Sequence, residues 1–441
     1  MMLTAMPKYD TYKDSGVEWL GDIPHDWKLI SLKRTIVGCV NGLWGKDPNS
    51  TNDIIVLRVA DFERNKLKIN DKKLTVRSIP LKDRCWRLLK KGDLLIEKSG
   101  GGDKTLVGCV VLFDKDYDAI TSNFVAKMTP KDKFDARFLC YLFSALYSSD
   151  VNYRSIKQTT GIQNLDSDAY LSEVAAFPLW RTQVAIANFL DQKTTQIDEA
   201  IAIKEKQIAL LNEHKQIQVQ QAVTRGLDPT VPMKNSGVAW IGKIPEHWQV
   251  KRLKFVLDER SERSLTGEEP LFMVSQQYGL VVRADYHEKA VVAASNIDSK
   301  IVYKNDLVFN KLKAHLGVFF KSNIDFKGIV SPDYAVYKIK DYISDTKILE
   351  LLFRNPLYIE QFTIRATGIV EGLIRLYTSD LFDISIPIAP KEEQLEILSH
   401  IEKMSALFDK AIEIHRDQCE KLKEYKTTLI NSAVTGKIKV V

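Results

Sequence analysis

Two long stretches of the chain repeat apolar residues with the period of an α-helix. Residues 183–224 and 394–435 align without a gap at an offset of 211 residues, and neither stretch contains glycine or proline. Spacings of three, four and seven between the apolar residues predict an amphipathic helix with coiled-coil character. The apolar positions are Ile186, Leu190, Ile197, Ile201, Ile208, Leu211 and Ala222 in the first stretch, and Ile397, Ile401, Met404, Phe408, Ile412, Leu422 and Ala433 in the second.

Each apolar stripe needs a surface to cover it, and the other helix has a stripe of the same length and period. We therefore expect the two helices, each roughly 60 Å long, to pair with one another. The alternative is that each helix docks separately on its own domain. Polar residues interrupt the stripes at Lys193, Lys204, His214 and His415. We interpret them as residues that set the register of the helix pair, or whose polar ends reach solvent, rather than as ligand-binding residues. The expected pairing residues are Ile197, Ile201, Ile208, Leu211, Phe408, Ile412 and Leu422.

The segments that precede the helices have mixed α and β patterns. β-branched and alternating runs predict strands, and each segment ends in a short helical pattern, at 136–146 in the first and 346–352 in the second. The expected strands are 54–59, 93–96, 106–113 and 124–128 in the first segment, and 271–274, 306–309, 317–320 and 334–339 in the second.

A second repeat accompanies the helices. Residues 13–33 return at 234–254 with eleven of twenty-one positions identical, including Trp19 with Trp240 and Trp27 with Trp248. KGDLLIEK at 91–98 likewise matches KNDLVFNK at 304–311. The chain is thus a tandem duplication, which predicts pseudo-two-fold symmetry and a partner or ligand that is itself two-fold or bipartite. We interpret the tryptophans as packing residues of a framework that anchors each variable domain against a helix end.

The order of these patterns predicts an α+β chain. Two mixed domains are expected, separated by two long helices, and glycine and proline around Gly226, Pro229 and Pro232 mark the boundary between the halves. The expected boundaries are 1–29 for an N-terminal segment, 30–176 for a first variable domain, 177–226 for a central helical region, 227–250 for the repeated connector, 251–385 for a second variable domain and 386–441 for a C-terminal helical region.

Composition indicates an ordinary globular protein. Of 441 residues, 45% are hydrophobic and 27% are charged, and this length is enough for about two to four domains. The five cysteines are scattered without the spacing of a metal site, which fits reduced thiols. No apolar run resembles a secretion signal or a membrane span. We therefore expect a cytoplasmic protein without membrane association, metal or cofactor.

Positive charge is concentrated between the repeats. Residues 30–160 hold 24 Lys and Arg against 15 Asp and Glu, whereas the whole chain has a net charge of only +6. Eleven cations lie between Arg64 and Lys91, where the acids are only Asp71 and Asp83. Such a distribution is typical of a surface that faces a polyanion, because lysine and arginine neutralise phosphates. The alternative is a solvated hairpin face.

Residues suited to DNA contact occur in both variable domains. SGGGDK at 99–104 combines a glycine triplet with flanking donors, although a plain flexible turn is an alternative interpretation. SQQYG at 275–279 offers amides that can bond to adenine in the major groove. The candidate DNA-binding residues are Arg58, Arg64, Lys66, Lys68, Lys72, Lys73, Lys98, Ser99 and Lys104 in the first domain, and Gln276, Gln277, Lys311, Lys313 and His315 in the second.

Patterns for catalysis are missing from the sequence. SGGGDKT at 99–105 lacks the spacing of a phosphate-binding loop, and there is no HExxH motif. Asp93, Glu97 and Lys98 suggest a metal-dependent nuclease, but the second copy replaces Glu97 with Asn310. We therefore expect no catalytic residues.

With both repeats in hand, the chain resembles the specificity subunit of type I restriction–modification systems. The motifs that carry the resemblance are SGVEWLGDIPHDW with SGVAWIGKIPEHW, KGDLL with KNDLV, TTGI with ATGI, and QQAVTRG with NSAVTGK. They span essentially the whole chain. One departure is the connector FPLWRTQ at 177–183, which lacks the second proline and the acid usual in the family, whereas IPIAPKEEQ at 386–394 has both.

The resemblance implies a non-catalytic subunit whose two target-recognition domains each read one half of a split double-stranded DNA site. The paired helices would set the spacer and dock two modification subunits, which bind S-adenosylmethionine and methylate adenine. Restriction subunits with translocase and nuclease activity would join them. The alternatives are a scaffold protein with a coiled-coil spacer and no specific DNA binding, and a lone methyltransferase or nuclease.

Overall fold

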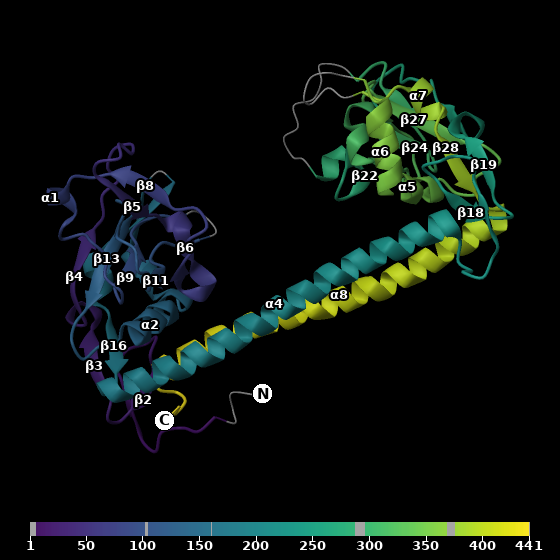
Figure 1. Cartoon of the computed structure of the whole chain (residues 1–441). Helices are drawn as coiled ribbons and strands as arrows, with labels where there is room; N and C mark the ends of the chain where they lie inside the picture. The colour runs from purple at the N-terminus through teal and green to yellow at the C-terminus, as the bar shows by residue number, and fades with distance from the viewer. Residues whose placement is uncertain (1–5, 102–104, 160, 287–295, 368–374, 441) are drawn as a thin grey trace. The chain divides into compact units, whose positions relative to one another are not determined.

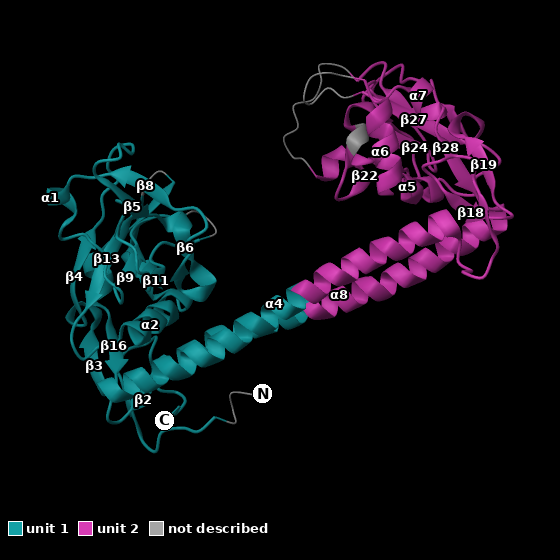
Figure 2. Ribbon diagram, viewed as in Figure 1, with its two compact units in different colours: residues 1–205, 416–441 teal, residues 206–415 magenta. Residues whose placement is uncertain are grey.

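The computed structural model describes residues 6–101, 105–159, 161–286, 296–367 and 375–440. The chain forms two compact units (Figure 2). Unit 1 consists of residues 1–205 and 416–441, and unit 2 of residues 206–415. The long helices α4 (Trp180–Arg225) and α8 (Lys391–Val434) each contribute residues to both units (Figure 1).

The main sheet of unit 1 is four-stranded and antiparallel, in the order β11-β9-β13-β4. Its interior strand β9 is buried along its whole length, as expected for the run Leu-Leu-Ile-Glu. Helix α2 begins at the cap Asp135, whose side chain accepts hydrogen bonds from the backbone N–H groups of Arg137 and Phe138. These elements form the core together with α4. Their bounds are β4 Ile36–Asn41, β9 Leu94–Glu97, β11 Val110–Leu112, β13 Val125–Pro130 and α2 Ala136–Ser148.

Smaller sheets surround this core in unit 1. Strands β12, β5 and β8 form a three-stranded sheet in which β12 and β5 are parallel, and β10, β15 and β14 form another. The remaining bounds are β1 Tyr12–Asp14, β2 Asp22–Pro24, β3 Lys28–Ser31, β5 Asp53–Leu57, β6 Phe62–Glu63, β7 Lys68–Ile69, β8 Thr75–Ser78, α1 Leu81–Arg84, β10 Ser99–Gly100, β12 Ala119–Thr121, β14 Ile156–Thr159, β15 Ile162–Leu165, α3 Ser167–Ser172 and β16 Val174–Phe177.

Unit 2 has a four-stranded sheet in the order β25-β24-β27-β20, so equivalent strands occupy equivalent places in the two sheets. Its bounds are β17 Met233–Asn235, β18 Lys243–Pro245, β19 Gln249–Arg252, β20 Leu257–Glu259, β21 Phe272–Ser275, β22 Gly279–Val282, β23 Lys300–Val302, β24 Leu307–Asn310, β25 Phe319–Lys321, β26 Gly328–Val330, β27 Tyr334–Ile339, α5 Lys347–Phe353, α6 Pro356–Arg365, α7 Thr378–Phe382 and β28 Ser385–Ile388.

The expectation of a mixed helix and sheet fold with a long helix is confirmed. Most predicted strands fall within two residues of observed ones, and β27 has the predicted limits. The strand predicted at 106–113 is wrong in length, because only Val110–Leu112 is extended as a strand. Gly108 has φ +106°, and a Cβ there would lie 3.2 Å from Asn152. Asn152 is buried and donates a hydrogen bond to the carbonyl oxygen of Val107, which fixes a turn at this place.

Within unit 1, the first part of α4 packs against the last part of α8. Ile197 and Ile201 belong to the same buried cluster as Cys419 and Leu429. Lys426 donates to both carboxylate oxygens of Asp198 at 2.7 Å. Positions early in α4 therefore face positions late in α8, so the two helical segments are antiparallel.

Within unit 2, the last part of α4 packs against the first part of α8. Lys215 donates to both carboxylate oxygens of Asp409 at 2.7 Å, and the His214 and Phe408 rings lie 5.2 Å apart. Of the other residues expected on the stripe, Ile412 is buried and Ile208 and Leu211 are half-buried in this unit, and Leu422 of unit 1 is half-buried. The helical segments of this unit are antiparallel as well.

The duplicated tryptophan segments pack against helix ends. In unit 1, a Cβ at Gly436, just beyond α8, would lie 2.4 Å from Pro24 and 3.3 Å from Trp27. In unit 2, a Cβ at Gly226, just beyond α4, would lie 3.5 Å from Trp248. Both glycines have positive φ, near +75°, which is the usual helix-terminating conformation. The interpretation of these tryptophans as framework agrees with this packing.

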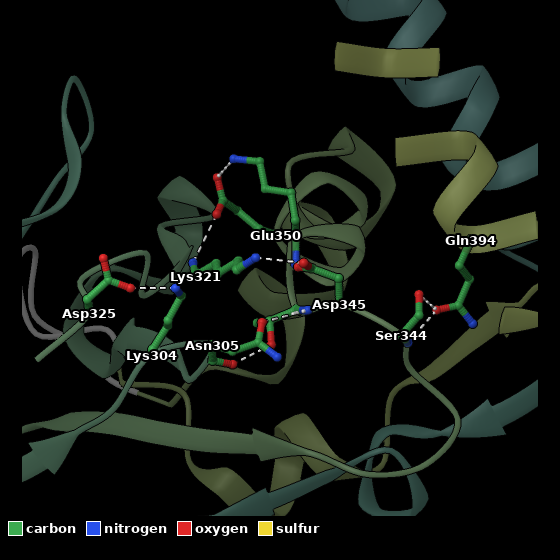
Figure 3. A network of polar contacts seen from close by, with 10 residues as sticks. Lys304, Asn305, Lys321, Asp325, Ser344, Asp345, Glu350 and Gln394 are labelled. Atoms are coloured by element: carbon green, nitrogen blue, oxygen red, sulfur yellow. Dashed lines mark hydrogen bonds and ion pairs between the residues drawn. The ribbon is translucent and has the colours of Figure 1, made fainter. Parts of the chain in front are cut away.

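A buried glutamine repeats the same contacts at the start of each long helix. Gln183 in α4 accepts from the Asp135 backbone N–H and donates to the carbonyl oxygens of Lys133 and Pro178. Gln394 in α8 accepts from the backbone N–H and the hydroxyl of Ser344 (Figure 3). It also donates to two carbonyl oxygens, those of Tyr342 and Ala389. Each glutamine ties a long helix to the loop before a shorter one.

Candidate nucleic-acid interface

Of the residues predicted to bind DNA in unit 1, the first four along the chain form ion pairs with nearby carboxylates. In the described part of the chain Lys72 and Lys73 are exposed and have no carboxylate within ion-pair distance. The neutralised cations form these ion pairs: Arg58 with Asp61 at 3.0 Å, Arg64 with Glu97 at 2.7 Å, Lys66 with Glu63 at 2.7 Å and Lys68 with Asp114 at 3.8 Å.

Arg64 lies on a buried carboxylate. Glu97 is completely buried, and burial raises the pKa of its carboxyl group even though the charge and hydrogen bonds of Arg64 act to lower that pKa. Asp93 accepts instead from the Lys90 backbone N–H at 2.7 Å and from the Thr129 hydroxyl at 2.6 Å. Asp93 and Glu97 thus have separate partners, and Arg64 is held inside the unit.

A different group of polar residues meets at the end of the unit 1 sheet. Asn41, the last residue of β4, accepts on its side chain from Lys98 Nζ at 3.0 Å and on its carbonyl oxygen from Arg87 Nε at 3.1 Å. Ser99 donates to Asn164 Oδ1 at 2.6 Å. We call Asn41, Trp86, Arg87, Lys98, Ser99, Phe124 and Asn164 the Asn41 surface.

The cations of the Asn41 surface are not neutralised by carboxylates. Among the described residues, neither Arg87 nor Lys98 has a carboxylate oxygen within 4.0 Å. Two aromatic side chains of the surface are exposed, Trp86 by 53% and Phe124 by 47%. Uncompensated cations, amides and exposed aromatic rings together are suited to phosphates and base edges.

Sequence reasoning found part of this surface and missed the rest. Lys98 and Ser99 were predicted, and Arg87 was counted in the basic run. Asn41 and Asn164 were not, because strand pairing brings them together from 123 residues apart. The aromatic residue inside a basic run was a usable signal for Trp86. Lys104 lies outside the described residues.

In unit 2, the predicted glutamines lie in an exposed turn. Gln276 and Gln277 connect β21 to β22, and the rings of Tyr278 and Tyr286 lie 4.8 Å apart beside them. A cavity of about 240 Å³ adjoins this turn, and Lys321 and Arg354 lie on its wall.

A buried carboxylate organises that wall. Glu350 is 3% exposed and accepts from the Lys321 backbone N–H at 2.9 Å (Figure 3). It also accepts from Lys347 Nζ and Arg354 Nη2, each at 2.7 Å. Lys321 Nζ donates to Asp345 at 2.7 Å, so carboxylates fix the cations of the wall in place. The exposed Arg354 and the amides and tyrosines of the turn are accessible from solvent.

Lys311 occupies the sheet position that Lys98 has in unit 1, but its surroundings differ. Lys311 and Lys300 both approach Glu259, at 3.4 and 3.1 Å. Burial acts to raise the pKa of Glu259, yet hydrogen bonds from Thr378 and Lys300 and the charge of Lys311 lower it overall. Lys311 is thus neutralised, whereas Lys313 is exposed. The side chain of His315 lies outside the description.

The long helices also carry an uncovered apolar face in unit 2. Leu210 and Ile217 of α4 are 53% and 42% exposed, and Leu407 and Ile414 of α8 are 71% and 49% exposed. Each pair is seven residues apart, so its members share one helix face. Ile217 is two residues beyond Lys215, and Leu407 is two residues before Asp409, its ion-pair partner. Because the segments are antiparallel, Ile217 and Leu407 lie at the same height along the helix pair.

Within the ranges that the structure describes, no group of three or more His, Cys, Asp or Glu side chains could hold a metal ion. No helix in those ranges is both long enough and apolar enough to cross a membrane.

No family model matches the chain. Two proteins of Methanocaldococcus jannaschii are similar to it. The type I restriction enzyme MjaVIII specificity subunit is 25% identical over 336 residues, which cover 73% of this chain and 75% of the relative. The putative type I restriction enzyme MjaX specificity subunit is 23% identical over 454 residues, which cover 100% of this chain and 99% of the relative.

Solved structures agree in fold. One, on complex assembly and conformational transition of the type I R-M system, has a TM-score of 0.66 at 14% identity and covers 93% of this chain and 98% of the other. The HsdS subunit of Thermoanaerobacter tengcongensis has a TM-score of 0.54 at 14% identity, with 94% and 98% covered.

The relatives that the chain resembles are specificity subunits of type I restriction enzymes. The chain is a homologue of type I restriction enzyme specificity subunits, and the resemblance found in its sequence is confirmed. The relatives' names also agree with the expectation of a non-catalytic chain.

Proposed function

We propose that the chain is the non-catalytic DNA-specificity subunit of a type I restriction–modification system. The observation that carries the proposal is similarity over the whole chain to a putative specificity subunit of nearly equal length. The subunit would recognise a bipartite double-stranded DNA site, and it would assemble two modification subunits and the restriction subunits around it. The variable domains, residues 30–176 and 251–385, would each read one half of the site.

The polar surfaces of the two units support a role in reading DNA. In unit 1, Lys98 and Arg87 supply positive charge that no carboxylate of the described residues neutralises, and Asn41 and Asn164 supply amides beside them. Lysine and arginine neutralise phosphates, whereas an asparagine amide can form two hydrogen bonds to adenine. In unit 2, the exposed amides of Gln276 and Gln277 would have the reading role.

The long helices support a role as a spacer with pseudo-two-fold symmetry. At about 1.5 Å per residue, α4 with its 46 residues would be roughly 70 Å long. The ion pairs Lys426–Asp198 and Lys215–Asp409 are equivalent, because both the lysines and the aspartates are 211 residues apart, the offset of the helix repeat. Such pairs contribute about 1 kcal/mol or less each, so their main effect would be to fix register.

The apolar face of Leu210, Ile217, Leu407 and Ile414 would dock a helix of a modification subunit. Exposed apolar residues repeated every seven positions on paired helices match the stripe of a further amphipathic helix. The residues that flank this face at helical spacing are exposed and carry both signs of charge, Lys206 and Glu213 on α4 and Lys403 and Lys410 on α8.

Methylation in a host tests the proposal. The chain is produced with its modification subunit in bacteria that lack adenine methylation, and methylated adenines are mapped across the genome. The expected result is methylation at one split sequence, and exchange of residues 30–176 for those of a homologue should change only one half of it. Random or absent methylation, together with no sequence preference in duplex titrations, would favour the scaffold alternative.

A further inference from the structure

A cationic segment with exposed apolar side chains borders the Asn41 surface. It runs from Pro80 to Lys91 through the short helix α1, and within it Leu81 is 68% and Trp86 is 53% exposed. The segment has five cations and one acid, Asp83. Among the described residues, Lys91 alone of these cations forms an ion pair with a carboxylate. The other cations are Lys82, Arg84, Arg87 and Lys90.

The side chains of Lys127 and Arg87 hold the backbone of this segment in place. Lys127, on the central strand β13, donates from Nζ to the carbonyl oxygens of Trp86 and Leu88 at 3.0 and 2.9 Å. Arg87 donates from Nη1 to the carbonyl oxygen of Asp83 at 2.6 Å and from Nε to that of Asn41. The segment is thus fastened to β4 and β13, and its exposed side chains are presented by a fixed backbone.

The guanidinium of Arg87 lies over the indole of Trp86, 3.6 Å from the ring centroid. Two hydrogen bonds to carbonyl oxygens fix Arg87, so the indole rests on a positioned cation and keeps half of its surface in solvent. An exposed indole held in this way costs little further entropy when a flat partner stacks on it. The neighbouring cations Lys82 and Arg84 have no carboxylate partner among the described residues, which favours an anionic partner.

A nucleic acid is the partner that is both flat and anionic. A folded acidic protein would match the charge but offers no stack of flat rings, and proteins that deform DNA insert apolar side chains between base steps while cations hold the phosphates. We propose that Trp86 stacks on an opened or kinked base step beside the half-site that unit 1 reads, with Arg84 and Lys82 on the flanking phosphates. This inference rests on the proposed function of the chain as a DNA-specificity subunit.

The inserted Trp86 side chain, which we call the wedge, would act through the shape of the DNA. Opening a step costs least where pyrimidine–purine steps stack weakly, so Trp86 would favour certain sequences next to the half-site without bonding to their base edges. The Asn41 surface would read base edges directly, whereas Trp86 would test whether the neighbouring step can deform.

The test uses the full chain with its modification subunit and a duplex carrying the methylated sequence found in the host. 2-Aminopurine is placed at successive positions within and beside the half-site, because its fluorescence rises when it is unstacked. The wild-type complex should raise the fluorescence at one step, and Trp86→Ala should abolish that rise and weaken binding about tenfold. Trp86→Phe should restore part of both effects.

Phe255→Ala is the matched control. Phe255 is also 53% exposed, and Lys254 lies 5.3 Å from its ring centroid, but it belongs to unit 2 and lies outside the candidate surfaces described. It should bind DNA like the wild type. Because an aromatic contact releases no counterion, Trp86→Ala should leave the dependence of affinity on salt unchanged, whereas Arg84→Ala should lower that slope by about one.

The outcomes separate the two proposals. A wild-type complex that shows no preference for the methylated duplex over a scrambled one contradicts the proposed function itself. A wild-type complex that prefers that duplex, with no unstacked step and with Trp86→Ala binding equally well, refutes the wedge alone. Loss of the modification subunit in Trp86→Ala also overturns the wedge, because the indole would then contact protein.

Discussion

Replacing Arg64 with alanine is expected to destabilise unit 1 rather than to weaken DNA contacts directly. The Arg64 guanidinium lies 2.7 Å from the carboxylate of Glu97, which is fully buried. Removing one partner of a buried ion pair leaves an uncompensated charge and costs about 3 to 5 kcal/mol. The Arg64 side chain is 29% exposed, so solvent screens part of the interaction and the lower end of that range applies.

The loss of stability in Arg64→Ala should depend on pH. Burial already raises the pKa of Glu97, and Arg64 counteracts this, so the variant should have a still higher pKa at Glu97. A carboxyl group whose pKa is higher in the folded than in the unfolded state binds a proton on folding. Stability therefore falls as pH rises from the unfolded pKa, about 4.3, to the folded one, by about 1.4 kcal/mol for each unit between them. The deficit of Arg64→Ala should be largest at neutral pH and shrink toward pH 4.

Thermal unfolding of the full chain measures this effect. For a unit of this size, 3 kcal/mol corresponds to a fall of roughly 6 to 12 °C in the midpoint of unit 1. Lys66→Ala is the control, because its partner Glu63 is exposed and the midpoint should move by less than about 2 °C. An unchanged midpoint in Arg64→Ala, with weaker DNA binding and a smaller salt slope, would refute this reasoning and put Arg64 on the DNA.

Three further perturbations address the other surfaces. Lys98→Ala should weaken duplex binding and lower the dependence of affinity on salt by about one unit of slope. Lys311→Ala should change that slope less, because Lys311 is paired with Glu259. Equal effects of the two variants would show that the Glu259 contact does not reduce the charge available to DNA. Ile201→Asp buries a charge at the helix pair and should alter the small-angle scattering profile of the chain, so an unchanged profile counts against pairing. Leu210→Asp with Ile217→Asp should leave the unfolding midpoint alone and weaken binding of the modification subunit at least tenfold; unaltered binding would move the docking face elsewhere.

The repeats made most of the framework predictable. A helix without glycine or proline and with a sustained apolar stripe has few alternatives, so the limits of α4 and α8 fell within three residues of the prediction. Strand β27 was equally clear because four of its six residues, in the run Tyr-Ala-Val-Tyr-Lys-Ile, are aromatic or β-branched. Pairings such as Lys28 with Phe177 could not be read, because they join segments 149 residues apart and carry no local pattern.

The polar surfaces were harder to predict for a different reason. Sequence counts charges but does not show which charges neutralise one another. Arg64 and Arg87 have the same weight in a basic run, yet Arg64 contacts the buried carboxylate of Glu97, whereas Arg87 contacts two carbonyl oxygens and the indole of Trp86. Strand pairing decides that difference, so the part of the run available to DNA became visible only in the fold.

The two units share a frame but differ in the polar groups at the ends of their sheets. Gln183 and Gln394 repeat the same contacts because each fixes a helix to its domain, and a change there would disturb the frame. At the end of the sheet, by contrast, Lys98 bonds to an amide and Lys311 lies on a carboxylate. A symmetric chain with identical surfaces would read the same sequence twice. Under the proposed function, the difference at the sheet ends would let one frame present two different chemistries, so that each half of the site could be specified independently.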